Sequence, residues 1–104
     1  MSQLELLTEH TWELYHTFEN GQVLDTSNTS NFIYTRNGSF LFESTPGNWQ
    51  SIGIYNFNSD SASINLRFTG TTEFIHMTLS ELSEKDLHTT FTTNGSDFLY
   101  KYRR

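Results

Sequence analysis

Turn signals recur at short intervals along the whole chain, and they constrain its fold more than any other feature. Asn-Gly between alternating apolar runs is the strongest short-range hairpin signal, because both residues tolerate the positive φ of a type I′ turn. Breaks of this and related kinds occur at Asn20-Gly21, Asn37-Gly38, Pro46-Gly47 and Asn94-Gly95 and in polar clusters at 58–61, 69–71 and 80–86. No interval between them holds a crossover helix, so the spacing predicts sequential antiparallel hairpins.

The segments between the turns predict nine short strands. We expect them at residues 11–19, 22–25, 31–36, 39–43, 49–57, 61–68, 72–79, 87–92 and 96–102. Several of them alternate apolar and polar residues, which presents one face of each strand to a core. A meander of this length leaves two unpaired edges unless it closes, so the sequence favours a closed up-and-down barrel of eight or nine strands.

The composition supports the all-β prediction. The chain has a single Ala, the best helix former, but 15 Thr and 16 aromatic residues, which prefer strands. Its 104 residues suit one domain, residues 1–104. The segment with Leu4, Leu6 and Leu7 predicts one or two helical turns that cap an open barrel end, and residues 25–30 predict a polar loop. There is no Cys, so stability depends on packing.

The charge balance limits the classes of partner. Six basic against twelve acidic residues give a net charge of −6, which opposes binding to nucleic acid and to anionic membrane surfaces. No apolar run has the length of a membrane span, and residues 1–5 lack the features of a signal peptide. We therefore expect a cytoplasmic protein, with an exported mature fragment as the open alternative.

Several short motifs follow one another in a fixed order along the chain: the leucine segment at 4–7, Trp12-Glu13-Leu14, Asn20-Gly21, Asn37-Gly38-Ser39-Phe40, Gly53-Ile54-Tyr55, the stretch 79–87 and Asn94-Gly95. This order of features resembles the small bacterial lipocalin-like domains, a calycin-type family of up-and-down barrels. The resemblance implies a ligand-holding or protein-interacting barrel without catalytic residues. It also implies a basic side chain from the last strand, Lys101, Arg103 or Arg104, stacked over Trp12.

Residues that carry catalytic or metal chemistry do not form a recognisable pattern. No two of the four His have the spacing of a metal-ligand motif. His16 is in phase with Trp12 and Phe18, which also fits a polar side chain that is hydrogen-bonded within a β-sheet. No Gly-x-Ser-x-Gly elbow and no phosphate-binding loop is present. We expect no enzyme activity, no metal and no cofactor.

The best functional candidates are aromatic residues predicted to face inward. A concave, mostly apolar interior with a few hydroxyls suits a small apolar or amphipathic ligand. The predicted ligand-binding residues are Trp12, Tyr34, Phe42, Tyr55, Phe68, Tyr100 and Tyr102, and Phe18, Phe32, Phe40 and Phe98 are expected on the same face. The alternative is a core filled by these rings, as happens in eight-stranded barrels, in a protein that acts through its outer surface.

Apolar residues predicted to face outward favour that alternative: Tyr15, Ile33, Leu41, Ile52, Ile54 and Leu99. The strand at 49–57 reads as apolar on both faces, with Trp49, Tyr55 and Phe57 on one and Ile52 and Ile54 on the other. A homodimer is the simplest way to cover the second face.

Overall fold

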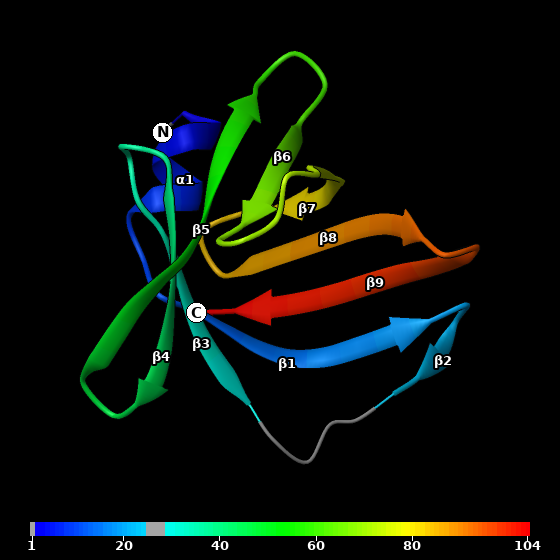
Figure 1. Cartoon of the computed structure of the whole chain (residues 1–104), viewed down its shortest axis with the longest axis horizontal. Helices are drawn as coiled ribbons and strands as arrows, with labels where there is room; N and C mark the ends of the chain where they lie inside the picture. The colour runs from blue at the N-terminus through cyan, green and yellow to red at the C-terminus, as the bar shows by residue number, and fades with distance from the viewer. Residues whose placement is uncertain (1, 25–28) are drawn as a thin grey trace.

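The computed structural model describes residues 2–24 and 29–104 and consists of one short helix and nine strands in that part of the chain (Figure 1). The elements are α1 (Gln3–Thr8), β1 (Trp12–Glu19), β2 (Gln22–Val23), β3 (Ser30–Tyr34), β4 (Ser39–Thr45), β5 (Asn48–Asn58), β6 (Ser63–Phe68), β7 (Ile75–Leu82), β8 (Asp86–Thr93) and β9 (Ser96–Arg103). Asp25, predicted to end the second strand, and most of the loop predicted at 25–30 lie outside the described residues. Within those residues, no helix is long and apolar enough to cross a membrane.

The strands form one antiparallel sheet that closes on itself. The hydrogen-bonded order runs β1-β3-β4-β5-β6-β7-β8-β9, and β9 pairs again with β1, from Glu13 opposite Arg103 to Glu19 opposite Phe98. The two-residue β2 pairs antiparallel with Phe18 and Glu19 at the end of β1, beyond the residues that pair with β3. Closure pairs the first strand of the barrel with the last, so the all-β, single-domain, up-and-down barrel predicted from the turns is confirmed.

The Asn-Gly turns are of two kinds. Asn20 and Asn94 have φ of 50° and 51°, and the following glycines have 83° and 78°, as type I′ turns require. Asn37 does not have a positive φ, whereas Gly38 has φ of 94° and donates its N–H to the Thr35 carbonyl. The hairpin between β3 and β4 is therefore as predicted, but a different turn closes it.

The N-terminal helix closes one end of the barrel, as the leucine segment predicts. α1 starts with a capping box, in which Ser2 Oγ accepts from Glu5 N–H and the Glu5 carboxylate accepts from Ser2 N–H. Leu7 is fully buried in the core, and its carbonyl accepts a 2.9 Å hydrogen bond from Trp12 Nε1. The Trp12 indole thus joins the helix to the first strand.

A β-bulge in β1 overturns two predicted orientations. Leu14 pairs with Tyr102, but the next pair is His16 with Lys101, so Tyr15 is the extra residue. A bulge reverses the alternation of faces, and Phe18 pairs with Leu99 on the outer surface. Phe18 and His16 were expected to share the inner face of Trp12, and both of these expectations are wrong.

The cations of the last strand lie over outer-surface rings. Arg103 lies over Tyr15, with Cζ 4.7 Å from the ring centroid, and Lys101 Nζ lies 5.4 Å from that of Phe18. Among the described residues Trp12 has no cation over it, so the stack implied by the family resemblance is replaced by these two contacts. Arg103 also donates a 2.7 Å hydrogen bond to Glu13, which ties β9 to β1.

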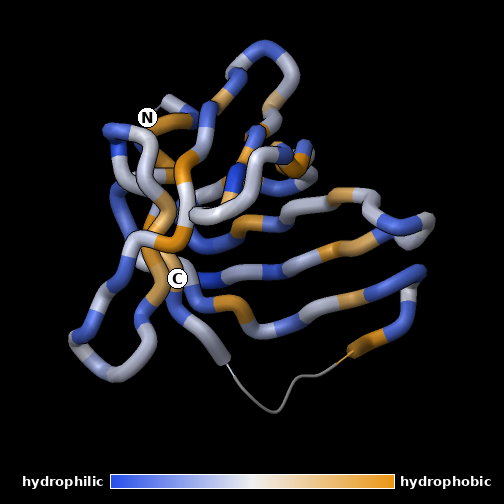
Figure 2. The backbone as a smooth tube through the Cα atoms, in the orientation of Figure 1, coloured by the Kyte–Doolittle hydropathy of each residue, from blue (hydrophilic) through white to orange (hydrophobic). Residues whose placement is uncertain are grey.

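A second bulge changes the predicted faces of β5. Phe40 pairs with Gly53 and Leu41 with Ser51, so Ile52 is the extra residue, and it packs against the core. Trp49 pairs with Glu43, and the shift at Ile52 puts it out of phase with Tyr55. The apolar surface on the outer face of β5 is therefore smaller than predicted. Ile52 packs inward, and Ile54, which is 43% exposed, remains on the outer face. Figure 2 shows apolar and polar residues alternating along several of the strands.

Candidate functional site in the barrel interior

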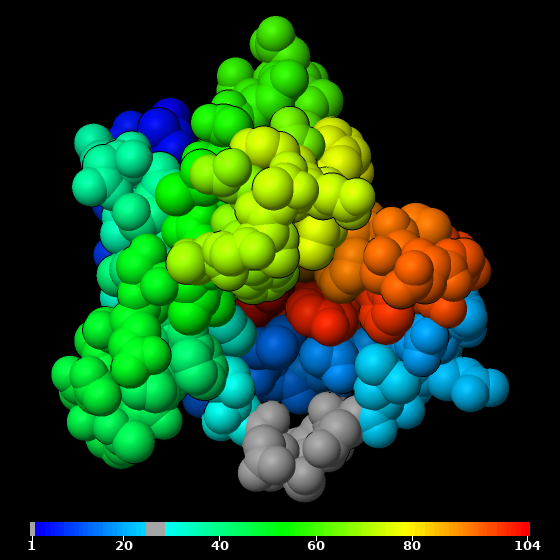
Figure 3. Space-filling view, in the orientation of Figure 1, coloured from blue at the N-terminus to red at the C-terminus, as the bar shows by residue number. Residues whose placement is uncertain are grey.

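The inner face of the barrel encloses a cavity of about 360 Å³. It is lined by residues of seven strands: Leu14, Phe32, Tyr34, Phe40, Leu66, Phe68, Ile75, Met77, Phe91, Tyr100 and Tyr102. Figure 3 shows a hollow in the molecular surface with β1 and β9, in blue and red, at its floor. These two strands carry the wall residues Leu14, Tyr100 and Tyr102.

Contacts between aromatic rings build most of the cavity wall. Phe32 stacks on Phe40 with centroids 5.2 Å apart and the planes 3° from parallel, and it meets Tyr102 edge-on at 5.9 Å. Phe91 meets Tyr100 edge-on at 5.1 Å on another part of the wall. Offset-stacked and edge-to-face pairs are the favoured aromatic geometries, so the wall is held by ring contacts between strands as well as by the sheet.

Burial differs between the two ends of this wall. Tyr34 is fully buried and Tyr102 nearly so, whereas Phe68 is 37% exposed and lies 6.4 Å from Phe40 in an edge-on contact. The exposed Phe68 therefore marks the open end of the cavity.

Two buried hydroxyls near the core have no hydrogen-bond partner in the described part of the chain. They are Tyr34 Oη, which has no accessible surface, and Thr89 Oγ1, on β8 beside the Tyr102 phenol. By contrast, the Tyr55 hydroxyl donates to the Thr35 carbonyl, at the start of the turn before β4. Buried polar groups are paired in the great majority of cases, so an unpaired Tyr34 hydroxyl is an exception that should cost stability.

The cavity wall is electrically neutral. No Lys, Arg, His, Asp or Glu is among the described residues that line it. Burial raises the pKa of Tyr34 well above its ordinary value, with smaller contributions from Tyr102 and Tyr55. Burial likewise raises the pKa of Tyr102, that of Tyr100 and, to about 12, that of Tyr55. All four phenols are therefore neutral at physiological pH.

The structure places four of the seven predicted binding residues on the cavity wall: Tyr34, Phe68, Tyr100 and Tyr102. The other three are elsewhere. Trp12 is fully buried beside α1, Tyr55 packs behind Tyr34 at 5.1 Å, and Phe42 packs on Phe32 at 5.4 Å beside a surface groove.

Sequence reasoning missed Phe91 as a wall residue. It follows Leu87 and Thr89 on one face of β8, but the threonines around it hide the alternation. The stacking of Phe98 on Phe91, at 5.1 Å, agrees with the inward face predicted for Phe98.

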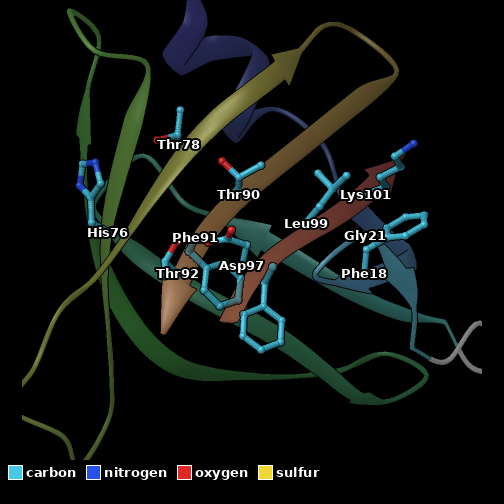
Figure 4. Close-up of a pocket in the computed structure, with 11 residues that line it drawn as sticks. Phe18, Gly21, His76, Thr78, Thr90, Phe91, Thr92, Asp97, Leu99 and Lys101 are labelled. Carbon is cyan, nitrogen blue, oxygen red and sulfur yellow. Dashed lines mark hydrogen bonds between the residues drawn. The ribbon is translucent and has the colours of Figure 1, made fainter. Parts of the chain in front are cut away.

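A second hollow lies on the outside of the barrel, across β1, β7, β8 and β9 (Figure 4). Its volume is about 800 Å³, and Phe18, Leu99, Thr90 and Lys101 are among its lining residues. Thr78 pairs with Thr90, which pairs with Leu99, so these side chains share the outer face. Phe91 lines both this hollow and the inner cavity, so the two meet at that ring.

No group of three or more His, Cys, Asp or Glu that would hold a metal ion lies together within residues 2–24 and 29–104. His76 Nδ1 contacts Asn65 Oδ1 at 3.0 Å, a pairing between neighbouring strands. Comparisons with protein-family models, curated proteins and solved structures returned no match. The fold and the cavity are therefore the basis for a functional proposal.

Proposed function

We propose that this chain is a non-enzymatic, lipocalin-like barrel that binds a small apolar or amphipathic ligand in its inner cavity. The observation that supports this proposal most is the cavity itself. It has a volume of about 360 Å³ and a wall of aromatic and aliphatic side chains, three of them tyrosines. This volume lies within the range of about 300 to 1,000 Å³ that is usual for ligand sites, and the wall has their usual composition. A core filled by side chains would leave no such space.

The lipocalin-like assignment rests on the order of elements. A short helix at one end, an up-and-down meander and closure of the first strand on the last agree with the family resemblance. Against it stands Trp12, because no cation of residues 2–24 and 29–104 lies over its ring. We propose the cytoplasm as the compartment, which agrees with a chain that contains no Cys.

Binding of naphthalene, a neutral bicyclic probe, tests the proposal. In ¹H–¹⁵N correlation spectra, we expect saturable shifts that concentrate on the residues of the cavity wall. Ile75→Trp, which places a larger side chain on that wall, should abolish the shifts. Ile33→Trp is the matched control, because Ile33 lies on the outer face, opposite Leu41. Absence of saturable binding to the unaltered protein, or equal binding by both variants, would overturn the proposal.

The second candidate is an interaction module that works through its outer surface. It is favoured by a surface groove lined by Leu4, Ile54 and Phe57, beside Arg36, in which Leu4 is 36% and Ile54 43% exposed. A second copy of the chain is the simplest occupant, as a homodimer. Sedimentation at high micromolar concentration tests this candidate: a dimer that Ile54→Lys dissociates supports it, and a monomer throughout excludes it.

A further inference from the structure

The bulge in β1 places a carboxylate on the inner face of the barrel. Beyond the extra residue Tyr15, Thr17 pairs with Tyr100 and Glu19 pairs with Phe98. Residues directly opposite each other in an antiparallel pair lie on the same face of the sheet, and Tyr100 is a wall residue of the cavity. Glu19 therefore lies on the inner face, whereas β1 without a bulge would have put it on the outer one.

The Glu19 carboxylate lies near the Tyr100 phenol. Diagonal neighbours across an antiparallel pair are about 7 to 8 Å apart, within reach of long side chains. Burial raises the pKa of Tyr100, and the negative charge of Glu19 raises it further. Both side chains are only partly buried, so a ligand that extends from the cavity along this face can reach them.

Three aromatic rings pack together beside this carboxylate, on the inner faces of β8 and β9. Phe91 stacks on Phe98 with centroids 5.1 Å apart, and Tyr100 meets the two rings edge-on at 5.1 and 6.4 Å. The face of an aromatic ring carries partial negative charge and attracts cations. We call Glu19 and these three rings the acidic rim of the cavity, because Phe91 and Tyr100 also line it.

The nearby cations do not neutralise the acidic rim. Lys101 and Arg103 of β9 lie over rings of the outer surface. Arg67 lies over Phe74, which is itself an exposed residue. Within residues 2–24 and 29–104, no Lys, Arg or His forms an ion pair with Glu19. An anionic ligand group at the rim is therefore repelled, and a cationic group is attracted.

The cavity beside the rim suits the apolar part of such a ligand. A water molecule takes about 30 Å³ in the liquid, so 360 Å³ corresponds to roughly a dozen non-hydrogen atoms at similar density. This is the size of a bicyclic aromatic molecule or a medium-length alkyl chain. The charged residues are outside the cavity wall, so the charge of the ligand must lie at the rim.

We infer that the barrel binds an organic amine of about this size, whose apolar body occupies the cavity and whose ammonium group lies at the acidic rim, between the Glu19 carboxylate and the rings of Phe98 and Tyr100. The inference rests on the proposed function, since it assumes that the cavity binds a ligand. It adds the charge of that ligand and the residue that selects it.

Three probes that share one ring system test the inference at pH 7: 2-naphthylmethylamine as the cation, 2-naphthol as the neutral molecule and 2-naphthoate as the anion. Calorimetry gives the dissociation constants. We expect the amine to bind about tenfold more tightly than 2-naphthol, because its ammonium group meets both a carboxylate and ring faces. We expect 2-naphthoate to bind about tenfold more weakly than 2-naphthol, because its charge has the sign of Glu19 and no counter-ion.

The variant Glu19→Gln identifies the residue responsible. It should lower the preference for the amine over 2-naphthol to about threefold or less, since only the attraction of the ring faces remains. Glu84→Gln is the matched control, because it removes the same charge from the segment between β7 and β8. That segment is near Arg103, at the opposite end of β9 from Phe98, and the change should leave the preference as it is.

A charge reversal is the second test of the same position. Glu19→Lys should invert the order of the probes, so that 2-naphthoate binds more tightly than the amine.

The outcomes separate the inference from the proposed function. If none of the three probes binds, the proposed function fails. If 2-naphthol binds but the amine binds no more tightly, the inference is overturned while the ligand-binding barrel stands. The same holds if the preference for the amine is unchanged in Glu19→Gln, or if it falls equally in Glu84→Gln.

Discussion

The substitution Tyr34→Phe should stabilise the ligand-free protein, which is the opposite of the usual effect of a change in a buried core. Tyr34 is 0% exposed, and its hydroxyl has no hydrogen-bond partner among the residues that the structure describes. In the unfolded chain the same hydroxyl is bonded to water, so folding removes those bonds without replacing them. The cost of such a group is about 1 to 3 kcal/mol, and Phe keeps the ring contacts while it removes the cost.

Urea denaturation of the ligand-free protein measures this effect. With a slope of about 1.5 kcal/mol per M, a gain of about 1 to 3 kcal/mol moves the midpoint upward by about 0.7 to 2 M. Tyr55→Phe is the matched contrast, since its hydroxyl donates to the Thr35 carbonyl. That variant should lose about 0.5 to 1.5 kcal/mol. A Tyr34→Phe midpoint that falls as far as that of Tyr55→Phe would refute the reasoning, because the Tyr34 hydroxyl would then be bonded in the folded state.

Three further predictions concern backbone packing, pH and the bulge in β5. Gly53→Ala should cost about 1 to 3 kcal/mol, because the added Cβ would lie 2.5 Å from the Arg67 carbonyl oxygen, and a urea midpoint equal to that of the unaltered protein would disprove this close approach of β5 and β6. Because burial raises the pKa of Tyr55 to about 12 and that of Tyr34 well above its ordinary value, the unfolded chain loses these protons first as pH rises above about 10. Stability should therefore be constant with respect to these groups below pH 10 and fall above it by about 1.4 kcal/mol per pH unit for each such tyrosine, and a flat profile from pH 10 to 12 would contradict the burial of the phenols. Ile52→Lys should destabilise the monomer, since Ile52 packs on the core, whereas Ile54→Lys should leave its urea midpoint unchanged, and equal effects would contradict the bulge in β5.

Much of the fold is predictable from local sequence, because its determinants act over a few residues. Asn20-Gly21 and Asn94-Gly95 specify type I′ turns that join neighbouring strands, and the alternation at residues 98–102 fixes which face of β9 is buried. The leucines at 4–7 likewise give α1 its buried side. Closure of the barrel follows from the number of strands and the need to pair both edges.

The orientation of several site residues is harder to predict from the sequence. A β-bulge has no reliable local sequence signal, and it moves every later residue of its strand to the opposite face of the sheet. The bulges at Tyr15 and Ile52 moved Phe18 and Ile52 from their predicted faces. Whether an inward tyrosine lines a cavity or packs behind its wall also depends on distant residues. Tyr34 and Tyr55 are both inward and aromatic, yet only the second finds a carbonyl for its hydroxyl, at the turn before β4.

A crystal structure of the protein saturated with 2-naphthol tests the central claim most directly. The account predicts one naphthol inside the barrel, among the aromatic residues of the cavity wall. An interior closed by repacked side chains, or naphthol bound only in the outer hollow beside Phe18 and Leu99, would contradict it.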